Sequence, residues 1–331
     1  MTTTTSTPLR ETARALVGAG RGILAADESV GTMSKRLQGA GVEPTQENRR
    51  AYRELLVTTE RLADGVSGVI FCDETLRQSL ADGRTFPRGL ADLGMMAGIK
   101  VDTGTTPLAG ADGETLTEGL DGLAGRVAEY VGLGARFAKW RAVLSIGDGR
   151  PSSWALLANA HALALYARVC QDAGLVPVVE PEILSEGAHT VHETAAATGR
   201  TLATLARTLA DAGVDPAGMV LKPNMVTAGA SAGRQCTPEE VARATVDTLR
   251  ATMPTDLAGV AFLSGGQSSE TAAANLAAIR RLDTPWPTTF SFGRALVSPA
   301  LGAWRGDTGA VADGQAALAG EVRRNVPVLS G

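Results

Sequence analysis

Short strand-like segments recur eight times along this chain of 331 residues, and longer stretches with helical spacing separate most of them. Strands that alternate with helices predict βαβ units and therefore a parallel sheet. The stretch 239–252 shows a typical helix start, because Thr237 and Pro238 suit the N-cap and the first helical position. The predicted strands are residues 22–28, 68–74, 96–102, 136–143, 175–183, 219–225, 259–266 and 288–293.

Eight such units in a chain of this length predict an α/β fold, a (β/α)8 TIM barrel, formed by a single domain over residues 8–331. The alternative is an open, doubly wound sheet. No GxGxxG motif follows the first predicted strand, which weakens a dinucleotide-binding form of that alternative. We expect residues 1–7, which are polar, to form a disordered tail and not a signal peptide.

Composition argues against several classes of function. The net charge of −4 gives no reason to expect binding to nucleic acid or to a membrane surface, and no apolar run is long enough to span a bilayer. Cys72, Cys170 and Cys236 are far apart and form no CxxC motif, which favours a cytoplasmic protein over a disulfide framework or a zinc cluster. His189 and His192 lack a third ligand, and we interpret them as surface residues.

Charged residues occur in the predicted strands where a barrel would gather them. Residues two apart in a strand face the same way, and the carboxyl ends of barrel strands converge on one site. A charge network that only fills the barrel is the other interpretation, but charges from five strands favour catalysis. These residues are Asp27, Lys100, Lys139, Glu180 and Lys222, with Arg141 and Glu182 on the same faces as Lys139 and Glu180.

Lys222 stands near the end of an apolar run and is followed by Pro223. A desolvated lysine loses its proton more easily and can then form a Schiff base with a carbonyl. For one strand-end lysine, a side chain that reaches solvent is the ordinary interpretation. The other charged residues reverse that preference and indicate an amine nucleophile.

Two sets of residues have the character of anion sites. Glycine turns and an arginine end the last two predicted strands, where barrels often bind phosphate. A second, weaker set follows the first strand, and two such sets on either side of a lysine indicate a bisphosphorylated substrate. The first set is Ser264, Gly265, Gly266, Ser291, Gly293 and Arg294, and the second is Ser29, Thr32, Lys35 and Arg36, with Lys100 of the third predicted strand nearby.

The chain resembles class I fructose-bisphosphate aldolase from about residue 22 to residue 304. The resemblance rests on GILAADES (22–29), GIKVD (98–102), FAKWR (137–141), VEPEIL (179–184), LKPNMVT (221–227), FLSGGQS (262–268) and FGRAL (292–296), in this order. It implies reversible cleavage of fructose 1,6-bisphosphate to dihydroxyacetone phosphate and glyceraldehyde 3-phosphate in glycolysis and gluconeogenesis. It also implies an imine route with no metal and no cofactor, and a homo-oligomer, with a tetramer favoured and a dimer as the alternative.

The resemblance also implies a role for each residue. Lys222 forms the Schiff base at C2, Asp27 takes the proton of the C4 hydroxyl, and Lys139 assists carbinolamine formation. Glu180 carries protons during dehydration, and we expect Glu182 to hold Lys139 or Lys222 in position.

For the phosphates, the resemblance places Ser264, Gly265, Gly266, Gly293 and Arg294 on the dihydroxyacetone side. It places Ser29, Thr32 and Lys100 at the other end, with Arg36 nearby, and we add Arg141 and Ser291 as substrate contacts. The sequence has no tyrosine after Tyr166, so we expect another group or water to transfer the proton at C3. Cleavage of a different ketose phosphate and a non-catalytic binding role stay open as alternatives.

Overall fold

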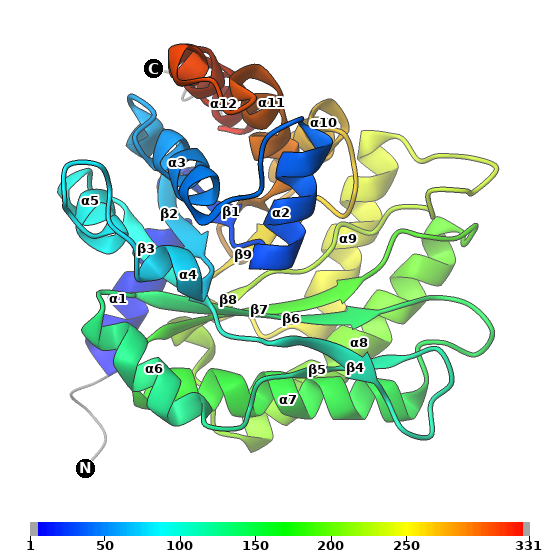
Figure 1. The fold of residues 1–331 in the computed structure, drawn as a ribbon. Helices are drawn as coiled ribbons and strands as arrows, with labels where there is room; N and C mark the ends of the chain where they lie inside the picture. The colour runs from blue at the N-terminus through cyan, green and yellow to red at the C-terminus, as the bar shows by residue number, and fades with distance from the viewer. Residues whose placement is uncertain (1–5, 327–331) are drawn as a thin grey trace.

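Eight parallel strands close into a barrel in the computed structural model, which describes residues 6–326 (Figure 1). Around the barrel the strands follow one another in chain order, from β1 and β2 through to β10, which pairs with β1 again. The predicted TIM barrel is therefore confirmed, and each predicted strand range overlaps an observed barrel strand, although β2 begins two residues before its range and β6 ends one residue after its range. The barrel strands are β1 (Gly22–Ala26), β2 (Val66–Phe71), β3 (Met96–Lys100), β6 (Phe137–Leu144), β7 (Val176–Ile183), β8 (Val220–Leu221), β9 (Gly259–Phe262) and β10 (Thr288–Phe292).

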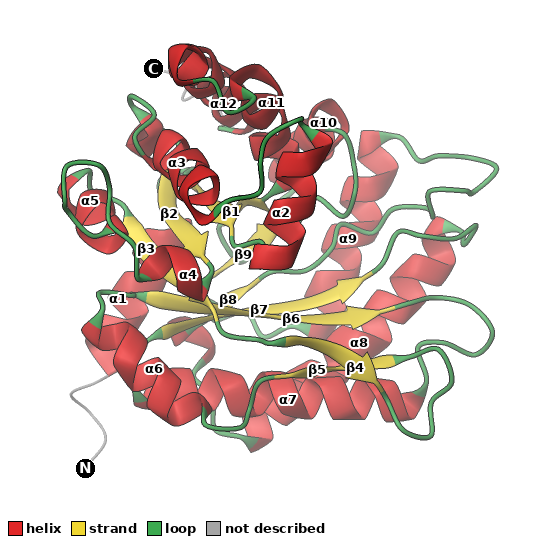
Figure 2. Cartoon of the chain, in the orientation of Figure 1, coloured by secondary structure: helices red, strands yellow, loops and turns green. Residues whose placement is uncertain are grey.

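Helices surround the barrel and cover the outer faces of its strands (Figure 2). The start predicted for α9 is confirmed, because Thr237 is its N-cap and forms a capping box with Glu240. The helices are α1 (Ser6–Val17), α2 (Val30–Gly39), α3 (Gln46–Val57), α4 (Asp73–Leu76), α5 (Phe86–Asp92), α6 (Leu123–Gly132), α7 (Ser153–Asp172), α8 (Val191–Asp211), α9 (Pro238–Thr252), α10 (Ser269–Arg280), α11 (Arg294–Trp304) and α12 (Val311–Asn325), with 3-10 turns η1 (Leu62–Asp64), η2 (Pro216–Gly218) and η3 (Thr308–Ala310).

The amino-terminal end of the barrel is closed by α1. Its buried side chains Leu9, Leu16 and Val17 belong to the same apolar cluster as Ile23 and Phe137 of the strands. Because α1 begins at Ser6, the last two residues of the predicted disordered tail are helical, and residues 1–5 lie outside the described part of the chain.

The interior of the barrel is built in two chemical layers. Near the amino ends of the strands, alternate inward positions carry apolar side chains, among them Phe137, Val178 and Val220. Two residues further along the same strands the inward positions carry Lys139, Glu180 and Lys222. Because residues two apart in a strand share a face, the inner face of the barrel is apolar near the amino ends of the strands and charged near their carboxyl ends.

Two local features differ from the predicted pattern. An antiparallel hairpin, β4 (Gly104–Pro107) and β5 (Thr115–Glu118), follows β3 and was not predicted. Strand β8 is shorter than its predicted range, because Pro223 has no N–H with which to continue the ladder. The backbone N–H of Lys222 still donates to the carbonyl of Val179 at 2.8 Å, which fixes this lysine against β7.

Candidate active site

A cavity of about 810 Å³ opens at the carboxyl ends of the barrel strands. Every residue predicted for catalysis lines this cavity, and so does every residue predicted for phosphate binding except Lys35, which is exposed on α2. The side chains come from the ends of several strands and from the loops that follow them, which is the arrangement typical of catalytic sites in barrels.

Four charged side chains form a row across the cavity floor. Lys139 Nζ lies 2.7 Å from Asp27 Oδ2 and 3.3 Å from Glu180 Oε2, and Lys222 Nζ lies 3.2 Å from Glu180 Oε1. Glu180 therefore sits between the two lysines. Lys139, Glu180 and Lys222 are each only 4% exposed, so this row is shielded from solvent.

The row holds its acids in the charged form. Burial acts to raise the pKa of Asp27, but the nearby Lys139 and Lys222 outweigh burial and bring that pKa below its ordinary value. The pKa of Glu180 is lowered by the same balance of burial against Lys139 and Lys222. Burial lowers the pKa of Lys139, but Asp27 and Glu180 reverse the effect, so that its pKa is raised.

One oxygen of Glu180 is available for chemistry. Among residues 6–326, Oε2 is buried and has no hydrogen-bond donor, because Lys139 approaches it at ion-pair distance without the geometry of a hydrogen bond. Such an acceptor costs free energy unless a group satisfies it. A substrate hydroxyl or a carbinolamine hydroxyl placed over the row would supply the missing donor.

Glu182 has a different partner from the one predicted. It pairs with Arg141 across β6 and β7, and not with Lys139 or Lys222. The backbone N–H of Arg141 also donates to Asp102 Oδ2 at 3.3 Å, and Asp102 Oδ1 lies 3.3 Å from Lys100 Nζ. Lys100, Asp102, Arg141 and Glu182 thus form a second connected set of alternating charges that lines the same cavity.

The loops after β9 and β10 provide the first anion site. Gly265 and Gly266 have φ values of +53° and +78°, a pair of left-handed residues that turns successive backbone N–H groups to one side. Gly293 is the N-cap of α11, so unpaired N–H groups and the positive end of a helix dipole also lie there. The hydroxyl of Ser291 is buried and has no hydrogen-bond partner within residues 6–326. A phosphate matches these donors.

The second anion site lies at the start of α2. Ser29 is the N-cap of this helix, and its hydroxyl donates to Thr32 Oγ1 at 3.1 Å. Arg36, one turn further along, pairs with Glu28. Lys100, from β3, lines the same cavity.

Some cavity residues were missed by the sequence analysis. Glu28, Thr103, Thr105 and Thr117 line the cavity, as does Asp102, the last residue of the GIKVD segment, to which no role was assigned. The three threonines come from the unpredicted β4–β5 hairpin and the turn before it. Recognition of this hairpin in the sequence would have placed the three threonines at the site.

The histidine prediction was half correct. His192 is exposed, but His189 is buried, and its Nδ1 lies 2.8 Å from Thr194 Oγ1. Within residues 6–326, no group of three or more His, Cys, Asp or Glu side chains is arranged to hold a metal ion.

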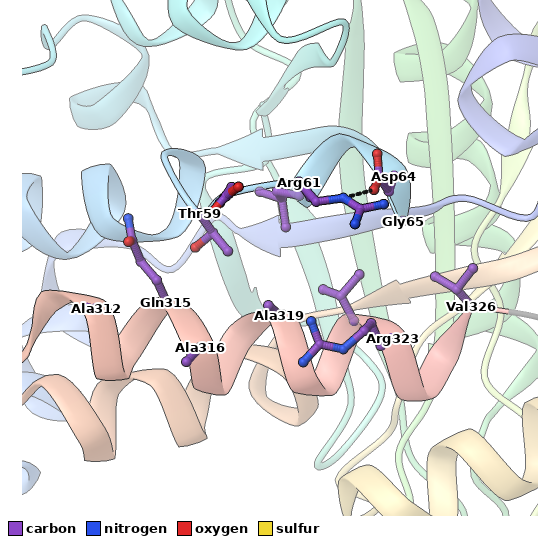
Figure 3. A pocket seen from close by; sticks show the side chains of 13 residues that line it. Thr59, Arg61, Asp64, Gly65, Ala312, Gln315, Ala316, Ala319, Arg323 and Val326 are labelled. Carbon is purple, nitrogen blue, oxygen red and sulfur yellow. Dashed lines mark hydrogen bonds and ion pairs between the residues drawn. The ribbon is translucent and has the colours of Figure 1, made fainter.

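A second cavity, of about 710 Å³, lies between α12 and the segment that precedes β2 (Figure 3). It is therefore beside the amino end of β2, away from the carboxyl ends of the strands. Arg61 and Asp64 form an ion pair of 2.7 Å on one wall, and alanines of α12 form the other. Both charged side chains are mostly exposed to solvent, so this cavity lacks the buried charges of the first one.

The part of the chain that is described includes no helix with the length and apolar character needed to cross a membrane.

Comparison with known proteins gives one consistent answer. The family model "Fructose-bisphosphate aldolase class-I" matches residues 8–330. "Probable fructose-bisphosphate aldolase class 1" of Xanthomonas campestris is 49% identical over 96% of this chain and 96% of its own length. Human fructose-bisphosphate aldolase C is 52% identical over 90% of this chain and 83% of its own length. A solved fructose-bisphosphate aldolase from Plasmodium falciparum, in complex with TRAP and an inhibitor, is 44% identical with a TM-score of 0.94, over 96% and 92% of the two chains.

Proposed function

The chain belongs to the class I fructose-bisphosphate aldolase family, and from that premise we propose which side chains perform each step of its reaction. The reaction is the reversible cleavage of fructose 1,6-bisphosphate to dihydroxyacetone phosphate and glyceraldehyde 3-phosphate in glycolysis. The observation that supports the assignment is the buried row Asp27–Lys139–Glu180–Lys222 between two anion sites.

Lys222 is the nucleophile in this proposal. Its amine adds to the C2 carbonyl of the open-chain ketose and gives a carbinolamine. Glu180, 3.2 Å from Lys222 Nζ, first takes a proton from the Lys222 ammonium and so frees the amine to attack. It then delivers this proton to the carbinolamine hydroxyl, which leaves as water, and the free Oε2 is the oxygen in position to do so. The product is a protonated imine between Lys222 and C2, which attracts electrons from the neighbouring bond.

Asp27 starts the cleavage. It takes the proton of the C4 hydroxyl, the C4 oxygen becomes the carbonyl of glyceraldehyde 3-phosphate, and the C3–C4 electron pair moves into the imine. The protonated imine thereby becomes a neutral enamine. Protonation at C3 and hydrolysis of the imine then release dihydroxyacetone phosphate and regenerate Lys222. Lys139, at 2.7 Å from Asp27, keeps this acid charged and ready to accept the proton.

The two anion sites fix the register of the substrate along the row. Gly265, Gly266, Gly293 and Arg294 bind the phosphate on C1, and Ser291 donates its free hydroxyl to it. Ser29, Thr32, Lys100 and Arg36 bind the phosphate on C6. Arg141, held by Glu182, contacts the sugar between them. Holding both ends places C2 over Lys222 and so lowers the entropic part of the barrier.

Trapping of the imine tests this assignment. Sodium borohydride with dihydroxyacetone phosphate reduces the imine to a stable secondary amine, and we expect peptide mass mapping to find the adduct on Lys222. Lys222→Met should lose the label, and Lys35→Met is the control that should keep it, because Lys35 is exposed and lies outside the cavity. A label on Lys139 in the unmodified enzyme, full activity in Lys222→Ala, or activity abolished by EDTA would contradict the proposal.

We also propose that the enzyme is a homo-oligomer that assembles through α7. Trp154, Leu157 and Leu165 are 50%, 52% and 39% exposed, and their spacing places them on one face of this helix with the exposed His161. Leu157 and Leu165 lie four residues before and after His161. Two antiparallel copies of α7 would therefore pair each leucine with the other, as a two-fold interface requires.

Light scattering tests the oligomer. We expect a dimer or a tetramer for the unmodified enzyme, and a smaller species for Leu157→Lys with Leu165→Lys. The control, Leu282→Lys, changes an exposed leucine outside α7. A monomer at micromolar concentration, or an unchanged mass in the double variant, would refute this interface.

The cysteines support a cytoplasmic location. Cys72 and Cys170 are buried free thiols and Cys236 is also unpaired, as is usual in a reducing compartment. Fractionation of the source cells tests this location, and recovery of the enzyme outside the cytoplasm would refute it.

A further inference from the structure

Glu28 has two arginine partners, one on the cavity wall and one buried behind it. Its Oε1 accepts from Arg36 Nη1, and its Oε2 accepts from Arg53 Nη2 at 2.6 Å. Glu28 and Arg36 line the substrate cavity, and Arg53 does not. One carboxylate therefore joins a side chain that substrate can reach to one that it cannot.

The two arginines are held very differently. Arg53, from α3, is 1% exposed, and its Nη1 also contacts Met33 Sδ at 3.0 Å. Burial acts to lower the pKa of Arg53, but Glu28 reverses the effect, so this arginine stays charged. The side chain of Arg36 is 26% exposed, and Glu28 is its one ion-pair partner within residues 6–326.

We propose that Glu28 and Arg53 are a positioning pair. They hold Arg36 at the edge of the cavity and allow it to exchange its ion pair with Glu28 for one with the C6 phosphate of the substrate. The idea rests on the proposed assignment of Arg36 to that phosphate. Glu28 needs one cation for neutrality and has two. When a phosphate takes Arg36, Arg53 still neutralises the buried carboxylate.

Arg53 is the residue that allows Arg36 to leave Glu28 and bind the phosphate. Without it, Arg36 could leave only by stranding a buried carboxylate with no counter-ion, which is strongly unfavourable. Glu28 also competes directly with the phosphate, because both are anions that a guanidinium binds well. Removal of Arg53 alone and removal of both members of the pair should therefore act in opposite directions on phosphate binding.

A purely structural role makes a different prediction. The Glu28–Arg53 pair also joins the start of α2 to α3, so its loss could loosen the fold. That effect would change all substrates alike. The ratio of the KM values for fructose 1,6-bisphosphate and fructose 1-phosphate separates the two roles, because only the first substrate carries a phosphate on C6.

The experiment compares this KM ratio in four variants. Arg53→Met should raise KM for the bisphosphate about tenfold relative to fructose 1-phosphate, since a tenfold change corresponds to the loss of about one charge-assisted contact. Glu28→Gln with Arg53→Met should return the ratio to the unmodified value or below it. Arg36→Ala should raise the ratio by itself. Arg49→Met is the matched control, because Arg49 also lies on α3 and also pairs with a glutamate, Glu74, outside the cavity.

The outcomes separate the two proposals. An unchanged ratio in Arg36→Ala refutes the assignment of Arg36 to the C6 phosphate, on which this inference depends. A raised ratio in Arg36→Ala, with equal effects of Arg53→Met on both substrates, refutes the positioning pair alone. If Arg53→Met does not fold, the double variant decides: a ratio at or below the unmodified value supports the pair, and a raised ratio refutes it.

Discussion

Replacing Lys139 by Met should destabilise the folded enzyme strongly at neutral pH. The change removes the cation that lies 2.7 Å from Asp27 and 3.3 Å from Glu180. At an effective dielectric constant of about 20, the contacts with Asp27 and Glu180 contribute about 6 and about 5 kcal/mol of Coulomb energy, and the desolvation of the ammonium offsets roughly half to two thirds of the sum. We therefore expect the free energy of unfolding to fall by about 3 to 5 kcal/mol at pH 7.

The pH dependence gives this prediction a second, independent test. In the folded enzyme the pKa values of Asp27 and Glu180 are below their ordinary values. The stability they contribute is present above the unfolded pKa values, near 4, and is lost as the pH falls through the folded ones. From pH 7 to pH 3.5 the unmodified enzyme should lose about 0.7 kcal/mol through Asp27 and a further amount through Glu180, and Lys139→Met should lose much less.

Urea unfolding at pH 7 and at pH 3.5, at one protein concentration, measures both quantities. Lys35→Met is the control, because the same substitution at an exposed site on α2 should change stability by less than about 0.5 kcal/mol. The reasoning is refuted if Lys139→Met stays within about 1 kcal/mol of the unmodified enzyme at pH 7, or if the difference is the same at both pH values.

Three further outcomes are expected. Glu180→Gln keeps the size of the side chain and removes its proton-carrying function, so kcat should fall by about 10²- to 10⁴-fold with the inhibition constant of inorganic phosphate nearly unchanged; a kcat within tenfold of normal would contradict the role of Glu180. Ser185 donates to the carbonyl of Gly265 at 2.9 Å, so Ser185→Ala should loosen the phosphate loop and raise KM about three- to tenfold at constant kcat, and an unchanged KM would exclude this support. Thr237→Ala should lower the free energy of unfolding by about 1 kcal/mol through loss of the α9 cap, and Thr237→Ser should lower it much less; equal losses would show that the hydroxyl is not the cause.

The barrel could be predicted from the sequence because its strands are buried on both faces. Such strands are continuous apolar runs, and segments such as 176–183 stand out between polar helices. The β4–β5 hairpin could not be predicted in the same way. Its first strand, Gly104–Pro107, is polar and mostly exposed, so no apolar pattern marks it.

The residues that line the site could be predicted from the sequence, but the ion pairs that they form could not. The period of two places Lys139, Glu180 and Lys222 on the inner face of their strands, and strand ends converge in a barrel. Which acid meets which base depends on the stagger between neighbouring strands. In the observed register Arg141 lies beside Glu180 on the adjacent strand, but its side chain reaches Glu182.

Residues outside the strands were harder to place. Glu28 directly follows the predicted Asp27, but its buried partner Arg53 comes from α3, and no local pattern links them. His189 is buried at a point where two loops meet, and the backbone N–H of Gly229 donates to its carbonyl. Both cases depend on contacts between distant segments.

The order of the buried row has a consequence for the energy of the whole catalytic cycle. Acid and base alternate along Asp27, Lys139, Glu180 and Lys222, and each neighbouring pair lies within 3.3 Å. A proton that moves from one member to the next leaves the sum of charges in the barrel unchanged. For the apolar side chains and helices around the row, such a transfer shifts the direction of a dipole but adds no net charge. In the proposed cycle, a proton that passes from Lys222 to Glu180 therefore moves without any rearrangement of the interior to solvate an ion.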